Sequence, residues 1–91
     1  MANSISTTGT TNDPASTKHQ NGESVQSWVT RHDKKVGDAT PSGNSLTTSW
    51  PCASGTETVT TNRNPGETDS AFQARHITDY LLQMLDCPPV P

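Results

Sequence analysis

The stretch GETDSAFQARHITDYLLQML, residues 66–85, contains three of the four leucines of the chain and predicts a helix. Apolar residues recur in it at intervals of 3 and 4, which places their side chains along one helical face. The predicted stripe consists of Ala74, Ile77, Leu81 and Met84, flanked by Ala71, Leu85 and either Phe72 or Tyr80. Arg75 and His76 precede Ile77, so we expect them at the border of this stripe or away from it.

Both ends of this helix are marked in the sequence. Thr68 is a good N-cap residue, and the neighbouring acidic residues suit the positive end of a helix dipole. Pro88 and Pro89 cannot continue a helix, so we expect its last turn near Asp86.

Upstream of the helix the apolar period is two, which is typical of strands. Residues 25–32 alternate and carry β-branched and aromatic side chains, residues 45–52 do the same, and residues 56–63 follow a short turn. The last two segments predict a hairpin. We therefore predict an α+β fold, in which a small antiparallel sheet of about three strands packs on one C-terminal amphipathic helix.

Residues 1–22 contain only Met1 and Ile5 as large apolar side chains. Burial of so little apolar surface cannot offset the entropy lost when a chain becomes ordered. We expect a disordered tail rich in Ser, Thr and Asn over residues 1–22, followed by a single small α+β domain over residues 23–91.

The composition predicts a small core. Leu, Ile, Val and Phe make up 12 of the 91 residues, and only 27% of the residues are hydrophobic. A core of this size barely offsets the ordering of the chain, and a three-stranded sheet leaves two edges unpaired. A homodimer, a protein partner or a disulfide would each stabilise such a domain.

Several classes of function are disfavoured. Residues 1–22 lack the basic start and apolar run of an export signal, which predicts a cytoplasmic protein, and no apolar run is long enough for a membrane span. The net charge of −3 argues against a nucleic-acid partner. Arg31, His32, Lys34 and Lys35 form a short basic cluster, but Asp33 and Asp38 interrupt it.

Cys52 and Cys87 have two interpretations. The expected cytoplasmic location favours reduced, buried thiols, whereas a disulfide between them would close a loop of about 35 residues and stabilise a weak core. His32 and His76 could complete a zinc site with them, but no C-x-x-C or H-x-x-x-H spacing is present. We predict no metal, no cofactor and no catalytic cysteine.

Trp28 and Trp50 are the largest side chains of the chain. Either both lie under the helix, or one faces outward and anchors an interface. Our leading hypothesis is a non-enzymatic interaction module that binds a protein partner, or itself, through the open sheet face or edge. The alternative is a small enzyme or ligand-binding domain, with His32, Arg63 and His76 around a pocket between helix and sheet.

Overall fold

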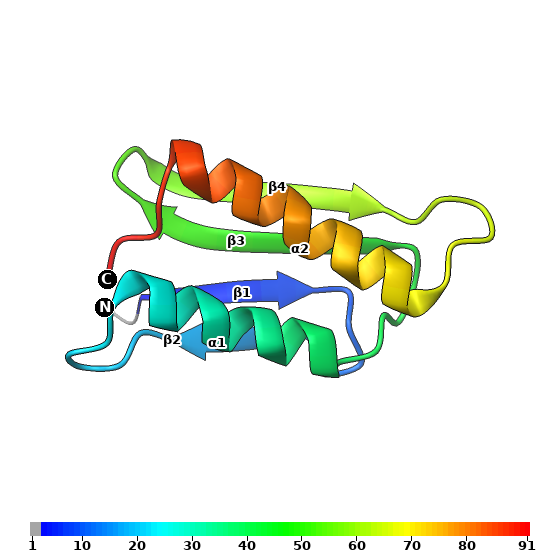
Figure 1. Ribbon diagram of the computed structural model, residues 1–91, viewed down its shortest axis with the longest axis horizontal. Helices are drawn as coiled ribbons and strands as arrows, with labels where there is room; N and C mark the ends of the chain where they lie inside the picture. The colour runs from blue at the N-terminus through cyan, green and yellow to red at the C-terminus, as the bar shows by residue number, and fades with distance from the viewer. Residues whose placement is uncertain (1–2) are drawn as a thin grey trace.

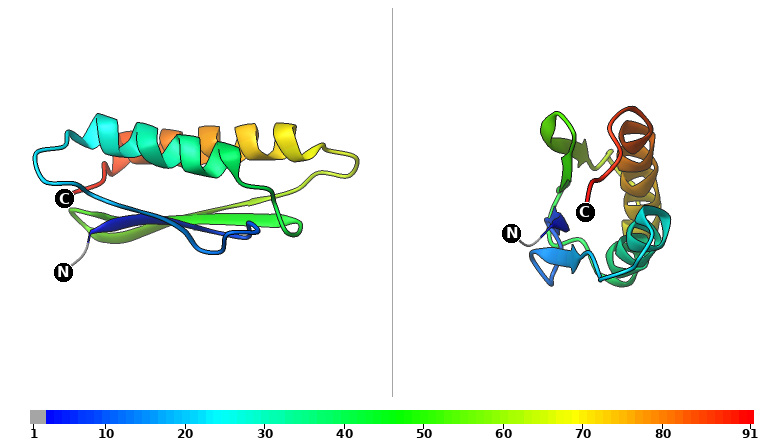
Figure 2. Two further views of the ribbon diagram at one scale, coloured as in Figure 1. Left: turned by 90° about the horizontal axis from the view of Figure 1, so that it is seen from below. Right: turned by 90° about the vertical axis from the view of Figure 1, so that its left-hand side faces the viewer.

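The computed structural model describes residues 3–91 and shows an α+β fold in two layers (Figure 1). A four-stranded antiparallel sheet has the strand order β2-β1-β3-β4, and two helices lie side by side on one of its faces (Figure 2). The elements follow the order β1 (Ser4–Thr8), β2 (Ala15–Lys18), α1 (Val25–Asp38), β3 (Ser45–Cys52), β4 (Gly55–Asn62) and α2 (Asp69–Asp86). Each half of the chain thus contributes a hairpin and a helix.

The C-terminal half agrees with the sequence analysis in its elements. β3 and β4 pair without interruption from Ser45↔Asn62 to Cys52↔Gly55, as predicted for the hairpin. The Thr68 side chain accepts a hydrogen bond from the Ala71 N–H, and α2 ends at Asp86. The predicted α+β class is confirmed, but the sheet has four strands rather than about three, and there are two helices rather than one.

The predicted strand over residues 25–32 is wrong, because these residues form the first part of α1. Ser24 caps the helix by accepting a hydrogen bond from the Ser27 N–H at 3.1 Å. The buried face of α1 consists of Trp28, His32 and Val36, which are four residues apart. One of the three is a histidine, so the helical period was hidden when only apolar residues were followed.

The predicted disorder of residues 1–22 also differs from the structure, which places β1 and β2 there. Met1 and Ala2 lie outside the described residues. The inner face of this hairpin buries Ile5, Thr7, Ala15 and Thr17. Two of these four side chains are threonines, so an estimate based on large apolar groups missed the segment. Their hydroxyl groups are hydrogen-bonded, which removes most of the cost of burying them.

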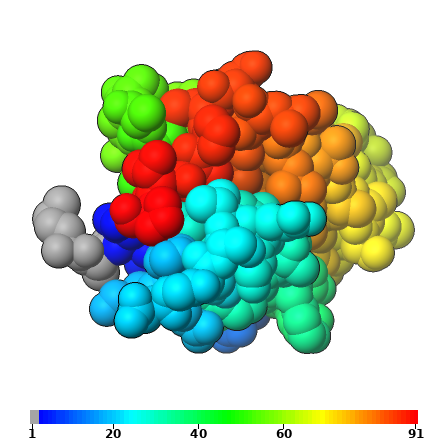
Figure 3. Space-filling view, turned by 60° about the vertical axis from the view of Figure 1, so that its left-hand side comes forward, coloured from blue at the N-terminus to red at the C-terminus, as the bar shows by residue number. Residues whose placement is uncertain are grey.

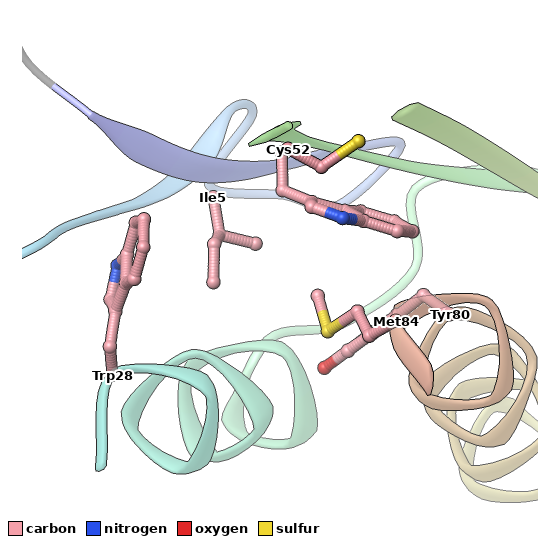
Figure 4. Close-up of a cluster of buried hydrophobic side chains, with 6 residues drawn as sticks. Ile5, Trp28, Cys52, Tyr80 and Met84 are labelled. Carbon is pink, nitrogen blue, oxygen red and sulfur yellow. The ribbon is translucent and has the colours of Figure 1, made fainter. Parts of the chain in front are cut away.

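The core lies between the sheet and the two helices (Figure 4). Ile5, Trp28, Trp50 and Tyr80 are all at most 1% exposed. The predicted stripe of α2 is rotated: α2 buries Phe72, Gln73, His76, Tyr80 and Met84. Leu85 is 78% exposed. The rotation arises because α2 packs on the sheet and on α1 at once, so its buried face is not centred on the aliphatic residues.

The C-terminal end of α2 is held by a disulfide between Cys52 and Cys87, so the expectation of reduced thiols is wrong. Trp50 Nε1 donates to the Cys87 carbonyl at 2.8 Å, and the Val90 N–H donates to the Pro51 carbonyl at 2.9 Å. The residues after α2 then lie against the start of α1 (Figure 3, red beside cyan).

Neither of the two described helices is sufficiently long and apolar to cross a membrane.

Candidate functional site: a buried Thr–His chain and two unlike sheet edges

The two halves of the molecule share a sequence motif at the start of each helix. Residues 22–32 and 66–76 both read G-E-[ST]-x-x-x-[WF]-x-x-R-H. The glycine has a left-handed backbone conformation in both, with φ of 79° at Gly22 and 76° at Gly66. This conformation explains why a residue without Cβ is used. The glutamate and arginine of each motif form an ion pair, at 2.7 Å in the first half and 2.8 Å in the second.

This motif is one part of a structural repeat with an approximate two-fold axis. The strand order β2-β1-β3-β4 is symmetric about the contact between β1 and β3, where Thr7 and Thr48 lie directly opposite each other. Each helix covers its own hairpin (Figure 1). The second strand of each hairpin and the helix that follows it are therefore equivalent in the two halves, with residue numbers that differ by 44. His32, for example, is equivalent to His76. The shared motif predicts this repeat, but the periods of apolar residues do not reveal it.

Near this axis the core contains a continuous chain of hydrogen-bonded side chains. His32 bonds Thr7 through Nε2 at 2.8 Å and Thr17 through Nδ1 at 2.7 Å. His76 bonds Thr48 through Nε2 and Thr61 through Nδ1, both at 2.7 Å. The two halves are joined by Thr7 and Thr48, whose hydroxyl oxygens are 2.6 Å apart. All six side chains are at most 4% exposed.

The direction of this Thr–His chain is fixed at one end by Asp79, whose carboxylate accepts from the Thr61 hydroxyl at 2.6 Å. Since Thr61 donates to Asp79, it must accept from His76 Nδ1, which leaves His76 Nε2 to accept from Thr48. Because the single hydroxyl proton of Thr48 is donated to His76 Nε2, the Thr48 oxygen accepts from the Thr7 hydroxyl. His32 therefore donates from Nε2 to Thr7 and accepts at Nδ1 from Thr17.

Both histidines are neutral at pH 7. Burial lowers the pKa of His32 to about 4, assisted by the positive charges of Lys35 and Arg31. Burial also lowers the pKa of His76 to about 4, although Asp79 opposes the change. Both ring nitrogens of each histidine are already hydrogen-bonded to threonines, so neither ring has a free nitrogen for a substrate or a metal.

The residues predicted to form a binding site do not come together. Trp28 of α1 and Trp50 of β3 are buried between the helices and the sheet, and the Trp28 ring nitrogen donates to the Thr17 carbonyl at 2.8 Å. Arg63 lies over the Phe72 ring and pairs with Asp69 at 2.8 Å. His32 and His76 belong to the Thr–His chain. Within residues 3–91, no three His, Cys, Asp or Glu side chains are placed to share a metal ion.

The outer edge of β4 presents backbone groups that have no partner. The Arg63 N–H donates to the Asn44 carbonyl at 2.8 Å, which extends the β3–β4 ladder by one hydrogen-bonded pair. Hydrogen-bonded and non-hydrogen-bonded pairs alternate in an antiparallel ladder, so the N–H and C=O groups of Thr56, Thr58 and Thr60 point away from β3. Among the described residues, no group is bonded to them. At the end of β4 the outward Asn62 carbonyl accepts from Arg75 of α2 at 2.6 Å.

The outer edge of β2 differs because side chains of α1 cover both of its outward carbonyls. The His19 N–H donates to the Asn3 carbonyl, which places the backbone groups of Ser16 and Lys18 on the outer side by the same alternation. Lys35 donates to the Ser16 carbonyl at 3.1 Å, and Arg31 donates to the Lys18 carbonyl at 2.7 Å. The equivalent of Lys35 in α2 is Asp79, which cannot donate when ionised.

The sheet face opposite the helices is covered by small hydroxyl side chains. Three cross-strand pairs on it are hydrogen-bonded: Ser6 with Ser16, Ser49 with Thr58, and Thr47 with Thr60. Neither tryptophan lies on this face, since both are buried between the helices and the sheet.

Comparison of the chain with protein-family models, with curated proteins and with solved structures gave no match.

Proposed function

We propose that the chain is a non-enzymatic protein interaction module, and that its binding element is the outer edge of β4. The observation that supports this proposal is the row of free N–H and C=O groups at Thr56, Thr58 and Thr60. An extended segment of a partner protein would pair with these groups and add a fifth strand to the sheet. Main-chain hydrogen bonds supply the affinity in this mode of recognition.

The edge is a better candidate than the open sheet face. Binding energy at protein interfaces concentrates in buried aromatic and arginine anchors. The open face offers Ser and Thr hydroxyls, and the side chains expected as anchors, Trp28 and Trp50, are buried between the helices and the sheet.

β4 also lacks the features that usually prevent strands from pairing at an exposed edge. It is eight residues long, contains no Lys or Pro, and pairs with β3 in continuous register. Its one charged residue, Glu57, is bonded to Gln83 of α2. β2, in contrast, is four residues long and has its outer carbonyls covered by Lys35 and Arg31. Arg75 covers the Asn62 carbonyl at the end of β4, so the two edges of the repeated fold differ over Thr56, Thr58 and Thr60.

Two carboxylates next to the β4 edge favour a partner segment that carries Lys or Arg. Asp79 contacts β4 at Thr61, and Glu57 lies on β4 itself. If two copies paired through this edge, the same carboxylates would approach one another. We therefore propose a different protein as the partner, and a homodimer is the competing outcome of the experiment.

The alternative of an enzyme or ligand-binding domain requires that His32, Arg63 and His76 converge on a pocket. The histidines are enclosed in the core, whereas Arg63 follows β4 and lies beside the first turns of α2, where it is engaged with Phe72 and Asp69.

The disulfide argues against the predicted cytoplasmic location, because disulfides persist mainly in oxidising compartments. We propose that the module acts in such a compartment.

The experiment uses a proline on the outer side of β4. A library of displayed random peptides is selected on the wild-type chain, and the selected peptides are measured against Thr58→Pro and Thr58→Val. Both variants lose the Thr58 hydroxyl, but only Thr58→Pro loses the outward N–H. We expect peptides that bind the wild type and Thr58→Val equally and Thr58→Pro at least about tenfold more weakly.

Equal binding to both variants would show that the β4 edge is not the site. Sedimentation equilibrium of the wild type separates the two kinds of partner. We expect the monomer mass of 9.7 kDa at all concentrations. A doubled mass that Thr58→Pro abolishes would assign the edge to a second copy of the chain.

A further inference from the structure

A basic hollow lies on the opposite side of the molecule from β4, between the outer edge of β2 and α1. It has a volume of about 550 Å³. Lys18, Arg31, Lys34 and Lys35 line it, which are four of the six Lys and Arg residues of a chain with a net charge of −3. One carboxylate, Asp38, also borders it and pairs with Lys34 at 2.9 Å.

The backbone of β2 makes this hollow rich in hydrogen-bond donors. Ser16 and Lys18 direct their N–H and C=O groups outward, and the two carbonyls are occupied by Lys35 and Arg31. The two N–H groups have no bonded partner within the described chain. The two carbonyl oxygens that would repel an anion are thus hydrogen-bonded to cations, and the free N–H groups of the same two residues lie beside these cations. Sheet edges with free N–H groups form anion-binding concavities.

The second half of the molecule serves as an internal control. At the positions equivalent to Lys18, Lys34 and Lys35 it carries Asn62, Thr78 and Asp79. The same strand and helix form with these residues, so the fold does not require a basic cluster here. Arg31, in contrast, has the equivalent Arg75, and both pair with the glutamate of the repeated motif. Lys18, Lys34 and Lys35 are therefore the residues specific to the hollow.

We infer that this hollow binds a phosphate-bearing anion, with the Ser16 and Lys18 amides and the Lys34 and Lys35 ammonium groups as its donors. Charge-assisted hydrogen bonds to phosphate are stronger than neutral ones, and several cations around one hollow suit a compact anion with more than one phosphate. A single-stranded nucleic acid would also need exposed aromatic rings on which bases stack. Trp28, the tryptophan of α1, is fully buried. This inference is independent of the β4 edge.

The probe is inorganic tripolyphosphate, titrated into the labelled full chain while amide chemical shifts are followed at two salt concentrations. We expect the largest shifts at the Ser16 and Lys18 amides. The test variant carries Lys34→Thr with Lys35→Gln, which lowers the net charge by two within the hollow. The control is Arg63→Glu, which lowers the net charge by the same amount away from the hollow. We expect the double variant to weaken binding at least about tenfold and the control less than about twofold.

Three outcomes would overturn the inference. Equal weakening by the double variant and by the charge-matched Arg63→Glu would mean that the probe senses only the overall charge. Shifts spread over all lysines without a maximum at Ser16 and Lys18 would mean that no site exists. Binding of a thymidine oligonucleotide without any binding of tripolyphosphate would assign the surface to nucleic acid instead. Because the double variant could also lower stability, its unfolding curve is measured beside the titration.

Discussion

At the scale of single residues, Asp79 breaks the symmetry of the molecule. An exactly two-fold arrangement of the Thr–His chain is impossible, because the hydrogen bond between Thr7 and Thr48 contains one proton and must point one way. The Asp79 carboxylate accepts from Thr61 and so sets the direction along the whole chain. At the position equivalent to Asp79 the first half has Lys35, which instead covers a carbonyl of β2.

This direction predicts opposite tautomers for the two histidines. His32 should carry its proton on Nε2, and His76 should carry it on Nδ1. The nitrogen chemical shifts of the imidazole rings distinguish the two forms at pH 7. The same tautomer in both rings would contradict the deduced direction, and Asp79→Asn is the variant expected to disturb it, since an amide can donate as well as accept.

The buried histidines also predict loss of stability in mild acid. Their pKa values are about 4 in the folded chain against 6.5 for an unperturbed histidine. For a histidine with a depressed pKa, stability is fully present above 6.5 and is lost as the pH falls from 6.5 toward 4, because the unfolded state binds protons first. We expect a loss of the order of 2 kcal/mol per histidine, measured by urea unfolding at pH 7 and pH 4.5.

Two other groups of residues titrate differently. Glu23 and Glu67 have pKa values lowered to about 2 by their arginine partners, so their contribution falls only below pH 4.5. Burial raises the pKa of Asp33, so protonation of Asp33 as the pH falls favours the folded state and opposes the effect of the histidines. His19→Gln is the control, since His19 lies outside the Thr–His chain and the loss assigned to His32 and His76 should remain in this variant. Equal stability at the two pH values would contradict the role given to His32 and His76.

At the scale of elements, sequence patterns predicted the second half of the fold better than the first. The β3–β4 hairpin and α2 were found because their turns, caps and strand composition are strong. α1 and the β1–β2 hairpin were missed because their buried faces contain His32, Thr7 and Thr17, whose burial depends on hydrogen bonds between elements. No period of apolar residues reveals such contacts. The same partners explain why His76, expected at the border of α2, is fully buried.

The deduced hydrogen-bond direction of β4 predicts unequal effects of proline at neighbouring positions. Thr58→Pro removes an outward N–H and should cost about 1 kcal/mol or less. Val59→Pro removes an N–H that bonds β3, and its ring would disrupt the ladder, so a cost of about 3 kcal/mol or more is expected. Urea unfolding of both variants measures the difference. Similar costs, or a larger cost for Thr58→Pro, would mean that the assigned hydrogen-bond alternation is wrong.

At the scale of the whole molecule, a repeated hairpin–helix unit explains how a chain with few apolar residues folds. In each unit the helix covers one face of its own hairpin, and the two units meet edge to edge between β1 and β3. The core estimated from the sequence was too small because it counted only Leu, Ile, Val and Phe, whereas Trp28, Trp50, Tyr80 and several threonines are buried as well. The need for a second copy of the chain is correspondingly reduced.

The candidate sites were less predictable than the fold. Sequence patterns favour five residues as binding or reactive side chains, and four of the five are buried. The five are Trp28, Trp50, His32, Arg63 and His76. The open β4 edge is a property of backbone groups and strand order, which the types of individual residues do not reveal. The basic hollow joins residues 16–20 to residues 31–38, and the first of these segments was assigned to a disordered tail.

Amide hydrogen exchange along β4 in dilute solution tests the open edge most directly. We predict an alternating pattern, in which Glu57, Val59 and Thr61 are protected by β3 and Thr56, Thr58 and Thr60 exchange rapidly with solvent. The equivalent measurement at high concentration should give the same pattern for a monomer. Protection of Thr58 and Thr60 equal to that of Val59 in the isolated chain would show that the β4 edge is already covered, and would contradict its role as the binding element.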